Sequence, residues 1–133
     1  ALKVRLAKDG DRLERGLALV APNDFHLVVD EGGLRLIDAP PVNCCRPSVD
    51  VLFDSLAKSG LGGRTAAVLL TGMGKDGGDG MAHLAAAGGI NIVQDESTSA
   101  VFGMPRAAID AGGAHHVLPL PEIPAAALKL FRA

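Results

Sequence analysis

The residues most able to do chemistry are two aspartates in a glycine-rich stretch near the middle of the chain. Residues 66–70 form a short apolar run, and the loop behind it carries Asp76 between glycines and Asp79 two places beyond Gly77. In α/β proteins, ligands bind where a loop leaves the carboxyl end of a strand and enters a helix. An acid there can orient a catalytic histidine, and exposed backbone N–H groups can stabilise an oxyanion.

Two other interpretations of this loop fit the residues as well. Residues 72–77 match the glycine fingerprint of dinucleotide-binding proteins, and Asp95 follows the next expected strand, where a ribose ligand would lie. Against it, Asp76 would place a negative charge beside the pyrophosphate, and the chain after the loop is too short for a second mononucleotide half. The third interpretation is a tight structural turn in which Asp79 caps the helix. All three remain open at this point.

The cysteines and histidines do not predict a second site. Cys44 and Cys45 are adjacent, which favours free thiols in a reducing compartment over a disulfide framework. No other Cys or His follows at ligand spacing, so we expect no metal. His26 falls within an expected strand and His83 on a helix surface, while residues 115–116 point to opposite faces of a strand.

The composition excludes several classes of function. The 133 residues fit one domain, and 48% of them are hydrophobic, which favours a packed globule. Only 3% are aromatic and the net charge is −2, so we expect no nucleic-acid partner. Because no apolar run approaches the length of a membrane span and no signal-peptide core is present, we expect a cytoplasmic protein without membrane insertion.

The pattern of elements predicts an α/β fold: a doubly wound, mostly parallel sheet with helices on both faces and a small antiparallel β-meander near the N-terminus. Residues 1–16 are mixed and charged and suggest a tail. The expected meander comprises three strands at 17–21, 25–29 and 34–37. Next, Ser48 is expected to cap an amphipathic helix that ends near Ser59, with Asp50 on its polar face. The rest alternates between strands at 66–70, 90–93 and 116–119 and helices at 81–87, 105–111 and 124–131.

The residues around the glycine loop carry a resemblance to a known family. Residues 71–81 read Thr-Gly-Met-Gly-Lys-Asp-Gly-Gly-Asp-Gly-Met, which resembles the motif of the chemotaxis protein-glutamate methylesterases, the CheB family. Residues 41–53, 94–98 and 102–109 agree with further family stretches in order and spacing, and residues 21–26 resemble its "APGDxH" segment. The similarity runs from about residue 3 to the C-terminus, which makes the dinucleotide fingerprint a coincidence.

The resemblance implies a serine esterase without a cofactor. Such an enzyme hydrolyses γ-glutamyl methyl esters on the cytoplasmic helices of methyl-accepting chemoreceptors, releasing methanol, and it deamidates specific receptor glutamines. Asp76 corresponds to the acid of the family's Ser-His-Asp triad, and the Met73 N–H to a donor of its oxyanion hole. Further candidates lie in motif loops at the expected carboxyl edge of the sheet: Asn43, Arg46, Thr71 and Gln94.

The sequence also departs from the family pattern. The family's serine lies in a "GASTGG" turn and its histidine in a "QHM"-like segment, and neither string occurs here. The regulatory receiver domain of many members has no counterpart either. Residues 1–133 are therefore expected to be a single partial domain, the C-terminal part of a catalytic domain that supplies only the acid and part of the oxyanion hole. A non-catalytic remnant that binds receptors or a partner is the alternative function.

Overall fold

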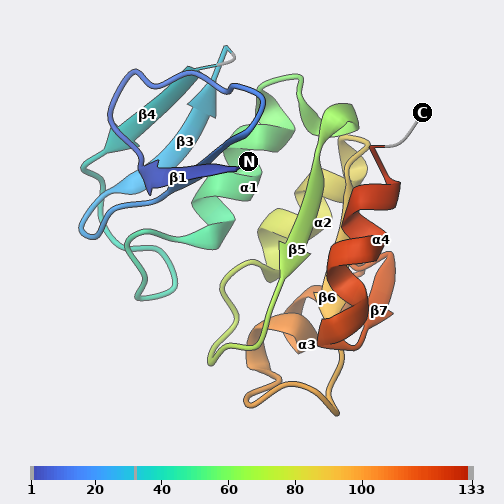
Figure 1. The fold of residues 1–133 in the computed structure, drawn as a ribbon. Helices are drawn as coiled ribbons and strands as arrows, with labels where there is room; N and C mark the ends of the chain where they lie inside the picture. Colours follow the sequence, from blue (N-terminus) through green and yellow to red (C-terminus); the bar gives the residue numbers. More distant parts are fainter. Residues whose placement is uncertain (1, 32, 132–133) are drawn as a thin grey trace.

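The computed structural model describes residues 2–31 and 33–131, which form three small sheets and four α-helices (Figure 1). The strands are β1 (Lys3–Leu6), β2 (Leu17–Val20), β3 (His26–Asp30), β4 (Gly33–Ile37), β5 (Ala66–Leu69), β6 (Ile90–Gln94) and β7 (His116–Leu118). The helices are α1 (Val49–Lys58), α2 (Gly78–Ala86), α3 (Gly103–Asp110) and α4 (Ile123–Lys129), with 3₁₀ turns at Gly62–Arg64 and Leu120–Glu122. In this part of the chain, no helix is long and apolar enough to span a bilayer.

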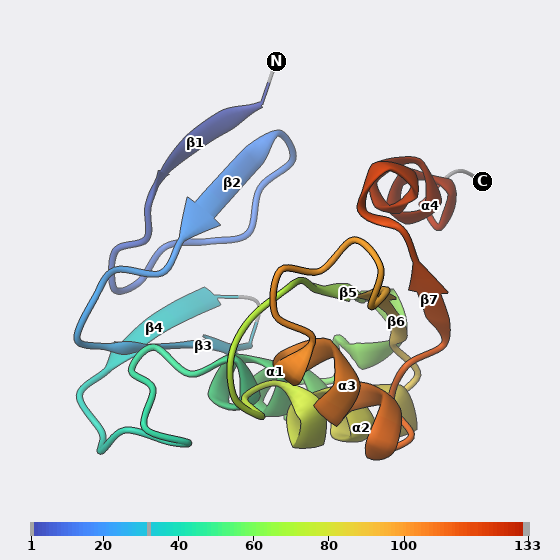
Figure 2. The same cartoon turned by 90° about the horizontal axis from the view of Figure 1, so that it is seen from below.

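The largest sheet is parallel, with strand order β5-β6-β7. In Figure 2, α1, α2 and α3 lie on one side of this sheet and α4 lies on the other. Helices α2 and α3 connect successive parallel strands in the order β5-β6-β7, so right-handed crossovers place both on the same side. The predicted fold class, an open α/β sheet with a small antiparallel part, is therefore confirmed.

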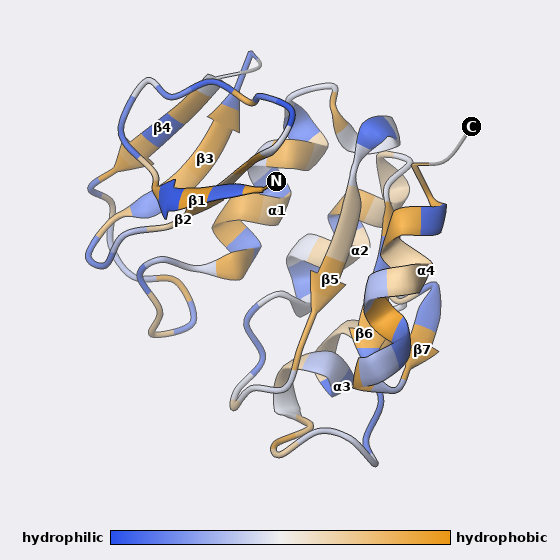
Figure 3. Ribbon diagram, viewed as in Figure 1, coloured by the Kyte–Doolittle hydropathy of each residue, from blue (hydrophilic) through white to orange (hydrophobic). Residues whose placement is uncertain are grey.

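Helix α1 packs against two separate apolar cores. Its Phe53 belongs to the core beneath the parallel sheet, together with Leu69 of β5 and Leu84 of α2. Its Leu52 and Leu56 also contact the second core, which lies between α1 and the β3–β4 hairpin. Figure 3 shows the hydrophobic and hydrophilic bands that alternate along this helix. Because α1 is apolar on more than one side, it joins the hairpin to the sheet.

The N-terminal third differs from the prediction. Residues 1–16, expected to be a tail, contain β1, which pairs in parallel with β2. Strand β2 is therefore not part of an antiparallel meander, and the antiparallel part consists of β3 and β4 alone. Strand β1 was not predicted, although Lys3–Leu6 alternates between charged and apolar residues, because it is only four residues long and its side chains are largely exposed. An ion pair holds the segment between β1 and β2. Arg5 contacts Asp11 at 2.8 Å and holds the pKa of the Asp11 carboxyl at about 2.

The start of α2 also differs from the prediction. The helix begins at Gly78 rather than at Met81, and its N-cap residue is Gly77, whose φ of +99° is accessible to glycine at little cost. Asp79 lies exposed in the first turn and is not the cap. The predicted cap of α1 is confirmed, because the Ser48 hydroxyl accepts the Val51 N–H. Asp50, expected on a polar face, is buried.

Helices α1 and α2 approach closely at Gly80. A Cβ at this position would lie 2.8 Å from the Cβ of Phe53 and 3.0 Å from the Cα of Asp50. Both neighbouring atoms are part of or next to the main chain of α1, so rotation of a side chain cannot relieve the contact. The absence of a side chain at Gly80 therefore sets the distance between the two helices.

We expect Gly80→Ala to lower the free energy of unfolding by about 2 kcal/mol, because the added methyl group overpacks the contact with α1. The higher helix propensity of alanine works in the opposite direction, so a net loss reports the clash. Urea denaturation measures the difference. Gly63→Ala is the matched control, because a Cβ there meets nothing within 4 Å. Equal stability of the two variants would contradict the prediction.

Candidate active site

The loop between β5 and α2 is fixed by the segment that leads into α3. The Gly72 N–H donates to the carbonyl of Val101 at 2.9 Å, and the Gly72 carbonyl accepts the N–H groups of Gly103 and Met104. The Thr71 hydroxyl both donates to the Val101 carbonyl and accepts the Val101 N–H. The loop therefore has a defined path although it is rich in glycine.

Gln94, at the end of β6, joins this loop to the next one. Its side chain is buried, its Oε1 accepts the Thr71 N–H at 2.8 Å, and its Nε2 donates to the Thr98 carbonyl at 2.8 Å. Asp95 accepts from the hydroxyl and the N–H of Thr98, and these hydrogen bonds lower the pKa of its carboxyl. Two of the predicted site residues, Thr71 and Gln94, thus meet at the carboxyl edge of the sheet, where they position the backbone.

Asp76 is 3% exposed, and its carboxylate accepts hydrogen bonds from four groups around the start of α1. The donors are the Ser48 hydroxyl at 2.7 Å, the Val49 N–H at 2.6 Å, the Asp50 N–H at 3.2 Å and the Asn43 amide at 3.0 Å. The N-terminus of a helix favours negative charge, so α1 stabilises the ionised carboxylate. These four hydrogen bonds therefore compensate for the burial of the Asp76 carboxylate.

Asp50 makes the reciprocal contact to α2. Its Oδ1 accepts the N–H groups of Gly77 at 3.0 Å and Gly80 at 2.7 Å, and its Oδ2 accepts the Asn43 amide at 2.7 Å. The sequence analysis missed this role. An acid in the first turn of a helix is a recognisable signal, but it usually serves its own helix, and only the close approach at Gly80 turns Asp50 towards the neighbouring one.

Met73 lies at the tip of the loop, and its side chain is 83% exposed. Within residues 2–31 and 33–131, its N–H has no hydrogen-bond acceptor. Gly74 follows with a φ of +93°, a conformation that suits glycine. The Met73 N–H, the predicted oxyanion-hole donor, is therefore not used in a hydrogen bond within these residues.

Arg46 and the two cysteines do not join this cluster. The Arg46 guanidinium contacts Asp38 and the Ala39 carbonyl, each at 3.3 Å. Cys44 and Cys45 are both free thiols, as predicted. Burial, together with the negative charge of Asp76, raises the pKa of the Cys45 thiol. Because the thiolate is the nucleophilic form, Cys45 is not activated.

In the described part of the chain, no histidine makes a hydrogen bond to Asp76. His26 is buried, with Nδ1 accepting the Ser48 N–H and Nε2 facing the Pro40 carbonyl at 2.9 Å. His83 lies exposed beside Asp54 at 2.7 Å, and this hydrogen bond raises the pKa of the imidazole. The Ser48 hydroxyl therefore faces an acid without a base to activate it.

The helix N-terminus behind the glycine loop is not available to a phosphate group. A pyrophosphate would need free N–H groups at the start of α2, and Asp50 already accepts those of Gly77 and Gly80. The dinucleotide interpretation of residues 72–77 is therefore wrong.

Comparison with known proteins agrees with this geometry. The family model described as CheB methylesterase matches residues 1–127. The chain belongs to the CheB methylesterase family. It is 53% identical over 131 residues to protein-glutamate methylesterase/protein-glutamine glutaminase 2 of Anaeromyxobacter dehalogenans, covering 98% of this chain and 38% of that protein. It is 49% identical over 132 residues to the protein of the same name from Pseudomonas aeruginosa, covering 96% of this chain and 38% of that one.

A solved structure of a CheB methylesterase shares the fold. The crystal structure of the Thermotoga maritima CheB methylesterase catalytic domain superposes with a TM-score of 0.88 at 38% identity, and the match covers 97% of this chain and 70% of that one. The predicted family membership is thus confirmed. The chain spans 38% of the length of the two relatives named above, so most of a CheB methylesterase lies outside it.

We expect Gln94→Met to destabilise the protein by about 1–3 kcal/mol, because it leaves the Thr71 N–H and the Thr98 carbonyl without their partner. Urea denaturation measures the loss, and faster amide exchange at Thr71 would place it in the loop. The control is Glu96→Gln, which changes an exposed side chain two residues after Gln94. Unchanged exchange at Thr71 would show that Gln94 does not fix the loop.

Proposed function

We propose that residues 1–133 are the C-terminal part of the catalytic domain of a protein-glutamate methylesterase and glutamine deamidase. The observation that supports this proposal is the burial of Asp76, whose carboxylate lies in the family's motif loop and accepts hydrogen bonds from the start of α1. Its Oδ2 accepts only the Val49 N–H within the described residues, so it retains a lone pair for an imidazole N–H. Asp76 is the acid of a Ser-His-Asp triad in this proposal.

The reaction uses a serine and a histidine from the part of the protein that precedes residue 1. The serine oxygen attacks the γ-carbonyl of the methylated glutamate while the histidine takes the serine proton. Asp76 stabilises the imidazolium, and the Met73 N–H donates to the oxyanion. The imidazolium then protonates the departing methanol, and water hydrolyses the acyl-enzyme. With a glutamine substrate, ammonia leaves instead of methanol.

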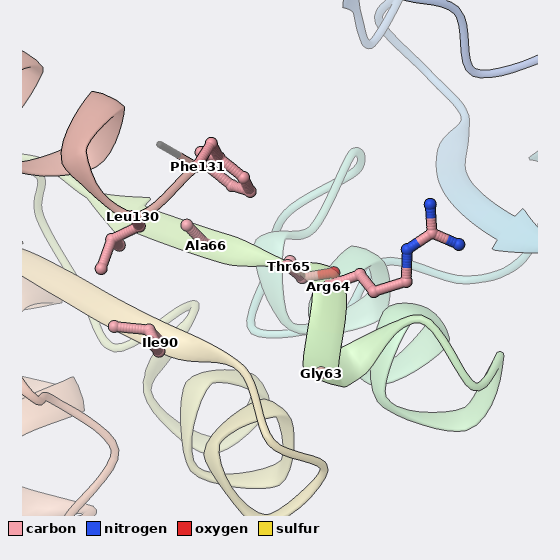
Figure 4. Close-up of a pocket in the computed structure, with 7 residues that line it drawn as sticks. All are labelled: Gly63, Arg64, Thr65, Ala66, Ile90, Leu130 and Phe131. Carbon is pink, nitrogen blue, oxygen red and sulfur yellow. The ribbon is translucent and has the colours of Figure 1, made fainter. Parts of the chain in front are cut away.

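Exposed strand edges and apolar surface support the presence of further chain in the same domain. In the described residues, β5 pairs only with β6, so its other edge is free. A hollow of about 450 Å³ lies at the amino ends of β5 and β6, lined by Thr65, Ala66, Ile90, Leu130 and others (Figure 4). It is at the opposite end of β5 from Asp76 and is therefore not the active site. The upstream strands of the domain are proposed to cover this edge.

The proposed substrates are methylated glutamates and specific glutamines on the cytoplasmic helical region of methyl-accepting chemoreceptors. The support is the family, whose members named above carry both activities in their names. By the same resemblance, a receiver domain regulates the intact protein, and the protein acts in the cytoplasm. The alternative, a receptor-binding or partner-binding module without activity, requires that the intact protein lack the serine and the histidine.

In the intact protein, Asp76→Asn is expected to lower kcat by about 10⁴-fold, because the amide cannot stabilise the imidazolium. Methanol release from methylated receptor membranes, expressed per folded molecule, measures the effect. Asp79→Asn is the matched control, because this exposed acid in the first turn of α2 has no proposed role and the variant should keep the kcat of the wild type. Wild-type turnover of Asp76→Asn would remove Asp76 from the triad.

Residues 1–133 alone are expected to release no methanol, because they supply the acid without a nucleophile or base. The isolated chain should also self-associate or be marginally stable through its free strand edge, as light scattering can show. Addition of the separately produced upstream part should restore a defined particle and turnover. A stable monomer, or activity near that of the intact protein, would contradict the proposed division of the domain.

A further inference from the structure

The two oxygens of Asp76 have unequal hydrogen bonding. Oδ1 accepts from the Ser48 hydroxyl, the Asn43 amide and the Asp50 N–H, whereas Oδ2 accepts only from the Val49 N–H. A carboxylate offers about four acceptor sites in all, two on each oxygen. Oδ1 is therefore saturated, and any additional donor has to approach Oδ2. The direction from which an imidazole can reach Asp76 is thus set by the donors on the other oxygen.

Asn43 is the donor to Oδ1 that also binds the second buried acid. Its Nδ2 contacts Asp76 Oδ1 at 3.0 Å and Asp50 Oδ2 at 2.7 Å. An amide nitrogen carries two hydrogens, so both are used, one for each carboxylate. Because the amide donates to both carboxylates, it bridges them and fixes their separation. Asn43 therefore holds Asp76 against a fixed point on α1.

The turn that carries Asn43 has a fixed backbone conformation. Val42 and Cys45 exchange two backbone hydrogen bonds, of 3.0 and 2.9 Å. The two residues between them, Asn43 and Cys44, have φ values of +53° and +61°. Asparagine tolerates this left-handed conformation better than most residues. Asparagine is therefore compatible with the backbone of this turn, and its side chain can donate a hydrogen bond to each of the two carboxylates.

We propose that Asn43 is a positioning residue for the hydrolysis, with Asp50 as its anchor, and that the pair fixes Asp76 so that Oδ2 faces the histidine. This inference rests on the proposed role of Asp76 as the triad acid. Asn43 does not contact substrate in this scheme and acts only through Asp76. Its loss lets the carboxylate rotate and shift, and a displacement of about 1 Å in a catalytic group can lower turnover by roughly 10²-fold.

The first test compares Asn43→Gly with the wild type in the intact protein. Glycine accepts the left-handed φ at this position, so the variant removes the amide without straining the turn. We expect kcat for methanol release to fall by about 10- to 100-fold per folded molecule with KM unchanged. Asn23→Gly, at an exposed loop position, is the matched control and should keep both constants. Wild-type kcat in Asn43→Gly would overturn the inference.

The second test asks whether Asn43 acts through Asp76. If it does, adding Asn43→Gly to Asp76→Asn should lower kcat by less than about twofold further, because residues that act as a unit are not additive. A loss in the double variant equal to the product of the single losses would assign Asn43 a general structural role and overturn the inference. Should Asn43→Gly fail to fold, Asn43→Ala replaces it, since it also removes both donors and adds no charge beside the two carboxylates.

The same measurements separate this inference from the proposed function. A crippled Asp76→Asn together with wild-type activity in the Asn43 variants overturns the positioning role and leaves the triad in place. Wild-type activity in Asp76→Asn overturns both. A crippled Asp76→Asn, a reduced kcat in the Asn43 variants and a double variant no worse than Asp76→Asn support both.

Discussion

Two buried carboxylates, each at the start of the other's helix, are the interaction on which the rest of the structure depends. Asp76 lies in the loop before α2 and binds the first N–H groups of α1, while Asp50 lies in α1 and binds the first N–H groups of α2. The first turn of a helix has N–H groups without intrahelical partners and a positive end of the dipole. Each acid satisfies these requirements for the neighbouring helix, so the two helices fix each other's position.

This arrangement requires α1 and α2 to lie close together, and the absence of a side chain at Gly80 allows it. Without a Cβ there, the backbone of α1 lies directly against α2, and the Asp50 carboxylate reaches the Gly80 N–H at 2.7 Å. Helix α1 also packs on the β3–β4 hairpin through Leu52 and Leu56. The position of the loop that carries Asp76 is therefore linked through α1 to the hairpin.

Much of this could be predicted from the sequence, and the limits have physical causes. The alternation of apolar runs with glycine and proline predicted β5–β7 and the helices around them, and Ser48 correctly predicted the start of α1. Strand β1 was missed because it is held by backbone pairing and its side chains are exposed. Residue spacing singled out Asp76 as a candidate acid, and the structure shows it buried at the start of α1. Spacing could not reveal Asp50 as a buried partner, because that role depends on a contact between segments about 30 residues apart.

The contact of Asp76 with the start of α1 has a consequence for the evolution of this sequence. The aspartate is needed for the packing of α1 whether or not the protein catalyses anything, since its removal would leave three donors at the start of that helix without their acceptor. A descendant that had lost its nucleophile would still be selected to keep this acid. An aspartate in the glycine loop is therefore a marker of the fold, and the serine and the histidine are the markers that distinguish a working enzyme from an inactive relative.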